Sequence, residues 1–270
     1  MKKNILLLLS VLVATTSGAW NNIGHRIVTD VAYHLVANKT RDAVNQVLGY
    51  ERAMVAMSSW ADDIKNDTIY PEQSEWHFQD IDGGKSAADI AYLFENKKAE
   101  GFHLFAAKDS LVSVLRHNPG DADALKFIVH ISGDEFQPMH MGHHDDLGGN
   151  RTRFTWFGQQ INLHSLWDRY LIDYTGYTST EYAQHLLCKY DSRSKEMHEM
   201  TELQCIMQTY DASTRIYDYV ALLETQKDAE GRYPRGFEYK FAYNFIDTME
   251  LQLYLAGAQL AKLLDELYGD

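Results

Sequence analysis

Apolar positions recur every three or four residues through most of the chain, which is the period of a helix that buries one face. Residues 20–37 show it through Ile27 and Val31, and residues 237–267 show it over a longer stretch. Few segments alternate apolar and polar residues as a strand does, and one small hairpin is expected near 152–157. The pattern therefore predicts an all-α fold.

Breaks in this pattern divide the chain into further helices. An Asn-Pro-Gly sequence precedes Asp121, which can cap a helix that passes through His130. Residues 67–84 are expected to form a loop, and so are residues 141–160, whose glycines and charges are typical of a functional loop. The last of the predicted helices before residue 237 should be interrupted. The other predicted helices cover residues 40–48, 54–64, 87–96, 106–116, 161–172, 179–188 and 193–225.

The first nineteen residues have the composition of a secretory signal peptide. Residues 1–19 start with two lysines, continue with a short apolar run and end in small residues before Ala19. The run is too short for a permanent membrane span, and no cysteine stands at the cleavage point of a lipoprotein. We therefore expect cleavage before Trp20, one domain over residues 20–270, and an exported protein, periplasmic or extracellular, without a permanent membrane anchor.

Composition and charge narrow the possible functions. A chain of 270 residues that is 45% hydrophobic can bury a sizeable core. The net charge of −13 argues against binding duplex DNA through a broad basic surface, although bound metal ions could attract a polyanionic substrate. The two cysteines, Cys188 and Cys205, could form a disulfide in an exported protein, and the sequence leaves this open. No obligate protein partner is implied.

Two histidine–aspartate pairs are the strongest candidates for metal ligands. His130 and Asp134 are four residues apart, as are His164 and Asp168, so each pair projects from one helix face. His140 follows the first pair closely. Single pairs of this kind are usually satisfied core histidines or surface ion pairs. Together on apolar helices they favour a zinc site with more than one ion, because buried imidazoles and carboxylates need partners.

Further motifs occur in a fixed order around these pairs. They are W-x4-H from Trp20, W-A-D ending at Asp62, W-H-F-x-D ending at Asp80, H-x3-D-x5-H, a D-x-G-G-N loop ending at Asn150, and N-L-H-x3-D ending at Asp168. In this combination the chain resembles the S1/P1 nuclease family, which are zinc-dependent secreted enzymes that cut single-stranded DNA and RNA. The resemblance suggests an exported member of bacterial type with a phospholipase C/P1 nuclease-like helical fold.

The resemblance implies a trinuclear zinc site with nine ligand residues, all of which are present here. One ion would be bound by Asp62, His77, His130 and Asp134. A second would be bound by His140, His164 and Asp168. A third would be bound by His25, Asp134 and the terminal amine and carbonyl of Trp20, so that Asp134 would bridge two ions.

The resemblance also assigns catalytic and substrate-binding roles. Phe78 would stack on a base, and Asp80 would hydrogen-bond the edge of that base. Lys65 and Asn150 would bind the phosphate and count, with Asp62, as catalytic. Without the neighbouring ligands, Phe78 would be taken as a core aromatic and Lys65 as a solvated residue. The expected reaction is hydrolysis of single-stranded DNA or RNA to 5′-phosphoryl products, with 3′-nucleotidase activity from the same site.

Two other functions would also use a buried zinc site. A zinc phospholipase C has a similar H-x3-D-x5-H run, but it typically ends with Glu where this chain has Asp168 and lacks the pair formed by Phe78 and Asp80. A non-catalytic zinc-binding protein would need neither Lys65 nor Asn150. The sequence does not distinguish RNA from DNA as substrate, nor does it give the role of the neighbouring His143 and His144, for which a surface loop is expected.

Overall fold

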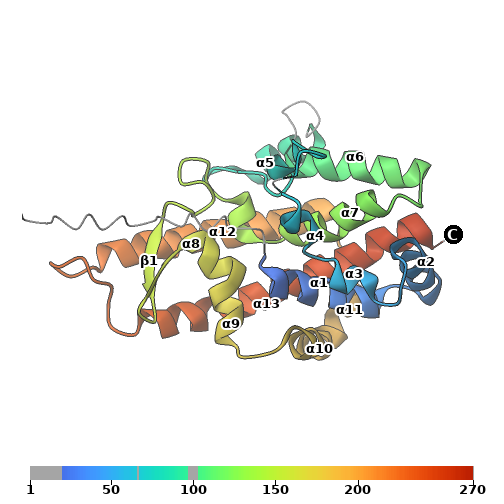
Figure 1. Ribbon diagram of the computed structural model, residues 1–270. Helices are drawn as coiled ribbons and strands as arrows, with labels where there is room; N and C mark the ends of the chain where they lie inside the picture. The colour runs from blue at the N-terminus through green and yellow to red at the C-terminus, as the bar shows by residue number, and fades with distance from the viewer. Residues whose placement is uncertain (1–19, 66, 97–102, 270) are drawn as a thin grey trace, which may run out of the picture.

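We describe a computed structural model over residues 20–65, 67–96 and 103–269. Helices dominate it, and the one sheet in these residues is a two-stranded hairpin, so the all-α prediction is confirmed (Figure 1). The helices are α1 (Asn22–Leu35), α2 (Asn38–Leu48), α3 (Ala53–Ala56), α4 (Trp60–Asp63), η1 (Gln73–Glu75), α5 (Ala87–Glu95), α6 (Leu104–His117), α7 (Ala122–Asp134), η2 (Pro138–Met141), α8 (Leu163–Ser165), η3 (Leu166–Tyr170), α9 (Leu171–Tyr174), α10 (Ser179–Tyr190), η4 (Asp191–Arg193), α11 (Ser194–Glu199), α12 (Glu202–Thr225) and α13 (Phe237–Tyr268). The antiparallel strands are β1 (Arg153–Trp156) and β2 (Gln159–Asn162).

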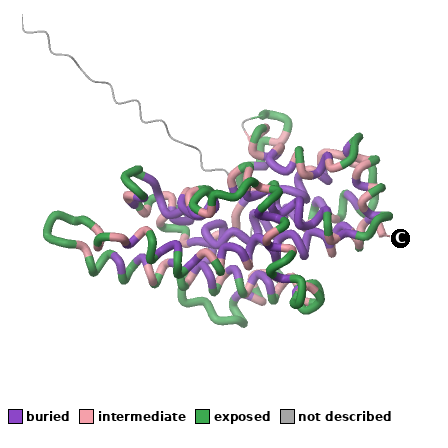
Figure 2. The backbone as a smooth tube through the Cα atoms, turned by 90° about the horizontal axis from the view of Figure 1, so that it is seen from below, coloured by how far each residue is buried: buried purple, intermediate pink, exposed green. Residues whose placement is uncertain are grey.

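Helix α13 is the longest element and runs along most of the molecule beside α1 (Figure 1). The two backbones approach closely at Gly257, where a methyl group would lie 2.6 Å from Val31 and 2.8 Å from the carbonyl oxygen of Val28. Buried residues are concentrated in these inner helices, whereas exposed residues mark the outer helix faces and the loops (Figure 2). The apolar face of α1 is thus fixed against α13, and α1 in turn carries His25.

Helix ends follow the expected capping chemistry. The Asp121 side chain accepts a hydrogen bond of 3.0 Å from the Ala124 amide, so the predicted cap of α7 is confirmed. Reciprocal capping boxes open α5, α10 and α12, where Ser86, Thr178 and Thr201 act as the caps. These caps satisfy amides that have no partner inside the helix.

Two predicted helices differ from the structure, and the predicted break in a third is confirmed. Residues 54–64 form two short helices, α3 and α4, because Arg52 starts α3 in a left-handed conformation and the chain turns again before Trp60. The predicted helix 161–172 is composite, since Asn162 ends β2 and then caps α8, which continues into a π-helical turn at η3. The interruption expected within 193–225 lies between α11 and α12.

The hairpin forms close to where it was expected, with Arg153 paired to Asn162 and Trp156 to Gln159. Both cysteines are free, Cys188 exposed and Cys205 buried, so the structure does not join them. No helix among the described residues is both long and apolar enough to cross a membrane. The predicted signal peptide, residues 1–19, lies outside the described residues.

Candidate metal centre and cleft

Helix α7 is buried on nearly all sides in its second half, and it carries His130 and Asp134 into the interior. Their side chains have no solvent exposure, and His130 Nε2 lies 3.4 Å from Asp134 Oδ2. The predicted one-face arrangement of this pair is therefore correct. A carboxylate at this depth is costly unless further groups satisfy it.

Three further side chains surround this pair, and we call these five residues the Asp134 group: His25, Asp62, His77, His130 and Asp134. His25 comes from α1, with its Nε2 3.3 Å from Asp134 Oδ1 and its ring stacked on His130. His77 follows η1, and its Nδ1 lies 3.0 Å from Asp134 Oδ2. Asp134 thus presents one carboxylate oxygen to each of two histidines on different sides. Asp62, on α4, approaches His130 at 3.9 Å.

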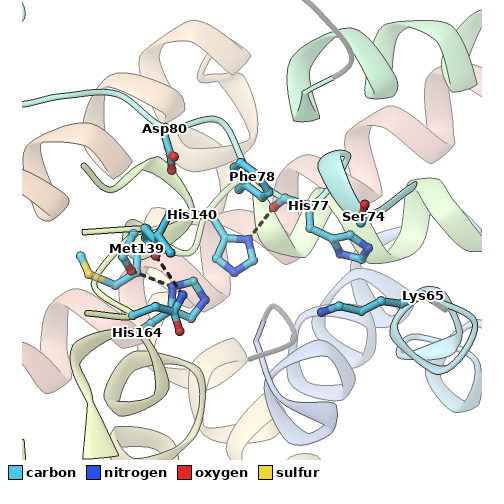
Figure 3. Close-up of a pocket in the computed structure, with 11 residues that line it drawn as sticks. Lys65, Ser74, His77, Phe78, Asp80, Met139, His140 and His164 are labelled. Carbon is cyan, nitrogen blue, oxygen red and sulfur yellow. Dashed lines mark hydrogen bonds between the residues drawn. The ribbon is translucent and has the colours of Figure 1, made fainter. Parts of the chain in front are cut away.

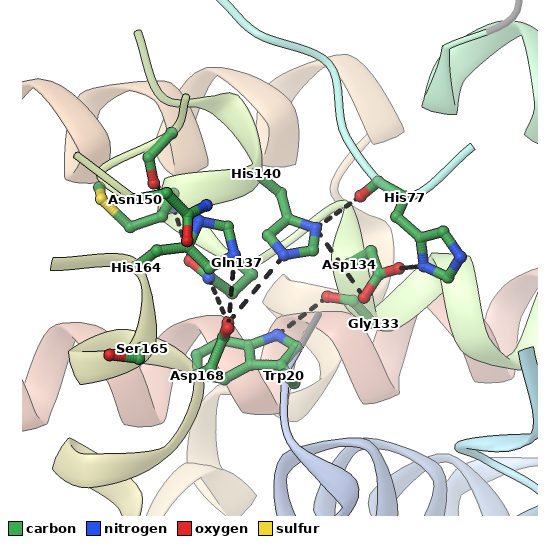
Figure 4. Close-up of polar contacts among 12 residues, drawn as sticks. Trp20, His77, Gly133, Asp134, Gln137, His140, Asn150, His164, Ser165 and Asp168 are labelled. Carbon is green, nitrogen blue, oxygen red and sulfur yellow. Dashed lines mark hydrogen bonds and ion pairs between the residues drawn. The ribbon is translucent and has the colours of Figure 1, made fainter. Parts of the chain in front are cut away.

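A second cluster, the Asp168 group, consists of His140, His164 and Asp168. His164 and Asp168 occupy the composite helix, with His164 Nε2 3.3 Å from Asp168 Oδ2. His140 comes from η2, and its Nε2 is 4.0 Å from Asp168 Oδ1. The Gln137 amide donates a 2.6 Å hydrogen bond to that same oxygen and fixes the carboxylate (Figure 4). The second predicted pair therefore also shares one face.

Backbone carbonyls orient three of the histidines. The Nδ1 atoms of His130, His140 and His164 lie within 2.5–2.7 Å of the carbonyl oxygens of Ser58, His77 and Gly148. Each Nδ1 must then carry the proton, which leaves the Nε2 lone pair of each ring facing the centre. This is the tautomer that a metal-binding histidine requires.

Burial also sets the charge of these groups. It lowers the pKa of His130 and His164 to about 4 and that of His140 to about 3, so the rings are neutral near pH 7. Burial alone would raise the pKa of Asp134, but the surrounding histidines hold it well below its usual range. Burial raises the pKa of Asp168 well above its usual range, with Gln137 opposing. The centre therefore combines neutral imidazoles with at least one carboxylate charge.

The donor set fits metal ions. Several buried nitrogen and oxygen atoms of the two groups have no hydrogen-bond partner: His25 Nδ1 and Nε2, Asp62 Oδ1, His77 Nε2, Asp134 Oδ1, His140 Nε2 and Asp168 Oδ2. Such orphaned atoms cost free energy unless something binds them. Tetrahedral zinc with bonds of about 2.0–2.2 Å separates its ligands by about 3.3–3.6 Å. The pairs formed by Asp134 with His25 and His130, and by Asp168 with His164, are 3.3–3.4 Å apart, and His77 lies slightly closer to Asp134, at 3.0 Å.

Trp20 lies between the two groups and is fully buried. Its indole nitrogen donates a 2.9 Å hydrogen bond to the Gly133 carbonyl on α7, and the next amide, of Asn21, donates to the Asp168 carbonyl at 3.0 Å (Figure 4). The start of the predicted mature chain is therefore held against both halves of the centre.

A cleft of about 210 Å³ opens beside the metal centre (Figure 3). His77, His140 and His164 form part of its wall. All four residues predicted to bind substrate also line it: Lys65, Phe78, Asp80 and Asn150. Phe78 is partly exposed and packs at one edge on His103, so it is not a core aromatic. The structure thus brings every sequence-predicted site residue to one region of the molecule.

Sequence reasoning missed the residues that shape this cleft. Leu147 and Gly148 line it, and both adopt positive φ angles, 56° and 60°. A side chain on Gly148 would collide with the carbonyl of Met139, so only glycine allows this approach. The D-x-G-G-N pattern was a signal for such a turn, but its contacts with distant parts of the chain were not visible.

Helix α12 holds the loops of the cleft in place. Tyr210 and Tyr217 are seven residues apart on one helix face, with Ser213 between them. Tyr217 donates a 2.8 Å hydrogen bond to Asp146 and stacks on His143, while Tyr210 donates to the Asp82 carbonyl. These two tyrosines therefore tie loops at the rim of the cleft to α12.

Fold and site together define a helical protein in which buried histidine–aspartate groups able to bind metal lie beside a cleft that carries an aromatic and a cationic side chain. Comparison with known proteins agrees, because the sequence model of the family described as S1/P1 Nuclease matches residues 20–269. The chain belongs to the S1/P1 nuclease family.

Individual relatives are distant. Endonuclease 3 of Arabidopsis thaliana is 29% identical over 185 residues, which cover 62% of this chain and 60% of the relative. Nuclease S1 of Aspergillus oryzae is 28% identical over 162 residues, which cover 58% and 55%. Nuclease P1 of Penicillium citrinum is 28% identical over 270 residues, which cover 93% and 98%. The chain thus matches less than two thirds of the length of the first two relatives and nearly all of the third.

Proposed function

We propose that this protein is a zinc-dependent nuclease that hydrolyses phosphodiester bonds of single-stranded DNA and RNA to 5′-phosphoryl products. The same site would remove the phosphate from 3′-nucleotides. The protein would act after export, in the periplasm or outside the cell, once residues 1–19 have been removed. Three zinc ions would be held by Trp20, His25, Asp62, His77, His130, Asp134, His140, His164 and Asp168.

One observation carries this proposal. The partnerless donor atoms of the Asp134 and Asp168 groups are buried beside a single cleft, and that cleft also contains Phe78 and Lys65. A protein that only stored zinc would have no use for an aromatic side chain and a cation beside the ligands. The family membership and the names of the relatives, all nucleases or endonucleases, point to the same activity.

The cleft residues have two proposed roles, because some would bind the base of the substrate and others its phosphate. Phe78 can stack on an unpaired base, which is worth about 1–3 kcal/mol and favours single strands because duplex bases already stack on each other. Lys65 and Asn150, which both line the cleft, would bind the non-bridging phosphate oxygens. Asp62 would orient the attacking water. Bound zinc supplies positive charge for the phosphate and lowers the pKa of water to about 7.

The acidic chain needs such a concentrated positive site. With a net charge of −13, its surface as a whole does not attract a polyanion. Zinc ions in the two groups would create a local positive potential in the cleft, and Lys65 would add to it. This focuses the substrate phosphate on the metal centre.

The test uses the mature protein, from Trp20 onward, on single-stranded and double-stranded DNA of the same sequence. We expect cleavage of the single strand, products with 5′-phosphate ends, loss of activity with EDTA, and recovery with zinc. Phosphate release from 3′-AMP is measured in the same samples. A zinc-loaded, folded protein that leaves both nucleic acid and 3′-AMP intact would contradict the proposal.

A zinc phospholipase C is the second candidate, since it uses a similar ligand run on a related helical fold. Release of phosphocholine from phosphatidylcholine vesicles, without cleavage of single-stranded DNA, would support it. Asp168 and the pair formed by Phe78 and Asp80 favour the nuclease.

A further inference from the structure

His144 lies at the rim of the cleft, next to the carboxylate proposed to read the base. Its Nδ1 is 3.5 Å from Asp80 Oδ2, and its backbone amide donates a 3.0 Å hydrogen bond to Asp82. The two contacts hold the loop after His140 against the segment that contains Asp80. The His144 side chain is 78% exposed, whereas that of Asp80 is 17% exposed. The histidine therefore covers one oxygen of a largely buried carboxylate from the solvent side.

Asp80 has few charged neighbours among the described residues. His144 faces it from the loop, His103 from the start of α6, Asp82 from its own segment and Tyr217 from α12. His103 also lies 3.7 Å from Glu75, so it interacts with that carboxylate as well as with Asp80. His144 is thus the basic side chain in direct contact with Asp80. Burial raises the pKa of Asp80, while His144 acts in the opposite direction.

We infer that His144 is a specificity-determining residue, which keeps Asp80 ionised and oriented so that the cleft prefers guanine over adenine. The inference rests on the proposed function, because it needs a base to lie between Phe78 and Asp80. His144 touches neither the metal centre nor the scissile phosphate in this scheme, so it acts through Asp80 and is a positioning residue.

Hydrogen-bond chemistry gives the direction of the preference. An ionised carboxylate only accepts hydrogen bonds, and guanine offers two adjacent donors on its pairing edge, N1–H and the N2 amino group. Adenine offers one donor, at N6, beside the N1 lone pair, which an ionised carboxylate repels. A protonated carboxyl group, which both donates and accepts, matches adenine instead. Whatever keeps the proton off Asp80 therefore favours guanine.

The effect of His144 should be largest where Asp80 would otherwise be protonated. Burial raises the pKa of Asp80, so this carboxyl group takes up a proton at a higher pH than an exposed one would. His144 should therefore preserve guanine preference under mildly acid conditions.

The experiment compares zinc-loaded wild type with His144→Gln and His144→Lys on the dinucleotides GpG and ApA, from about pH 5 to 8. We expect His144→Gln to lower the GpG-to-ApA ratio of kcat/KM by about twofold to tenfold at the acid end, the worth of one hydrogen bond. His144→Lys should keep the wild-type preference across the range. His198→Gln, an exposed histidine on α11, is the matched control. Zinc content should be equal in all variants.

The carboxyl titration of Asp80, followed by carbon-13 NMR, gives a second readout that does not depend on activity. His144→Gln should raise the Asp80 pKa. In an Asp80→Asn background, His144→Gln should leave the ratio unchanged. Equal GpG-to-ApA ratios in wild type and His144→Gln at every pH would overturn the inference while leaving the nuclease proposal intact. Failure of every variant, wild type included, to cleave either dinucleotide would instead contradict the proposed function.

Discussion

Asp134 is the side chain that contacts histidines on two sides of the Asp134 group. Its two carboxylate oxygens face different histidines, Oδ1 toward His25 and Oδ2 toward His77 and His130. It is fully buried and yet held ionised by these rings. A carboxylate in this position can serve two metal ions at once, and no neighbouring acid could replace it, because Asp62 approaches from one side only.

Asp134→Asn should therefore cost more zinc than any other single change at the centre. Removing the charge weakens ligation on both sides, and we expect a loss of more than one zinc per chain and a drop in nuclease activity of more than about 100-fold. Elemental analysis and a single-strand cleavage assay measure the two effects. The control is Asp173→Asn, at an exposed ion pair with Arg169, which should change neither. Full zinc content in the Asp134 variant would disprove the shared-ligand arrangement.

Zinc should stay bound at lower pH than ordinary histidines would allow. Burial lowers the pKa of His130 and His164 to about 4 and of His140 to about 3, and only the neutral ring can bind metal. Falling pH therefore displaces the metal as it approaches these values and not near 6.5. Dialysis over a pH series, followed by zinc analysis, should show retention at about pH 5 and loss below about pH 4. Release that is already half complete near pH 6.5 would contradict this.

At the scale of elements, α12 positions the cleft without contributing to its metal centre. Tyr217 joins α12 to the loop of Asp146 through a hydrogen bond between residues 71 positions apart. Tyr217→Phe removes the hydroxyl and keeps the ring that stacks on His143. We expect KM for single-stranded DNA to rise by about threefold or more, with zinc content unchanged, since one hydrogen bond is worth about 1 kcal/mol.

Tyr219→Phe provides the control for this prediction, because Tyr219 lies on the same helix and its ring packs on Phe241 and Phe245. Kinetics of the two variants are compared at equal zinc content. If Tyr217→Phe behaved like Tyr219→Phe, the loop would not depend on α12 in the way the structure indicates.

The contact between α1 and α13 allows a test of the fold. Gly257→Ala places a methyl group 2.6 Å from the Val31 side chain and 2.8 Å from the Val28 carbonyl oxygen, both on the packed helix α1. We expect a loss of about 1–3 kcal/mol in the free energy of unfolding, measured by urea denaturation of the zinc-loaded protein. The exposed change Glu266→Ala on the same helix should stay within about 0.5 kcal/mol of wild type. Unchanged stability of Gly257→Ala would mean that the helices are less tightly packed.

Across the whole molecule, sequence patterns predicted those features that depend on local periodicity. The spacing of His130 and Asp134 on a helix, and the cap at Asp121, follow from helix geometry alone. The composite helix around Asp168 and the division of residues 54–64 were not predictable, because tertiary contacts override propensity there. The contact of His144 with Asp80 joins two loops 64 residues apart, and no local pattern encodes it.

The N-terminus gives the last prediction, which concerns the molecule as a whole. Trp20 is fully buried and tied to α7 through Gly133, and Asn21 is tied to the Asp168 carbonyl, so the start of the predicted mature chain cannot move away from the centre. An amine at Trp20, with a free pKa of about 8, can lose its proton and bind zinc, whereas the amide of a longer chain cannot. A protein that begins at Trp20 should therefore bind one zinc more than a protein with two extra residues before it, and it should be more active on single-stranded DNA. Zinc analysis and cleavage rates of the two forms test this, with unfolding by urea as the control for equal folding. Equal zinc content and equal rates would show that the terminal amine is not a ligand, and removal of the leader would then matter for export alone.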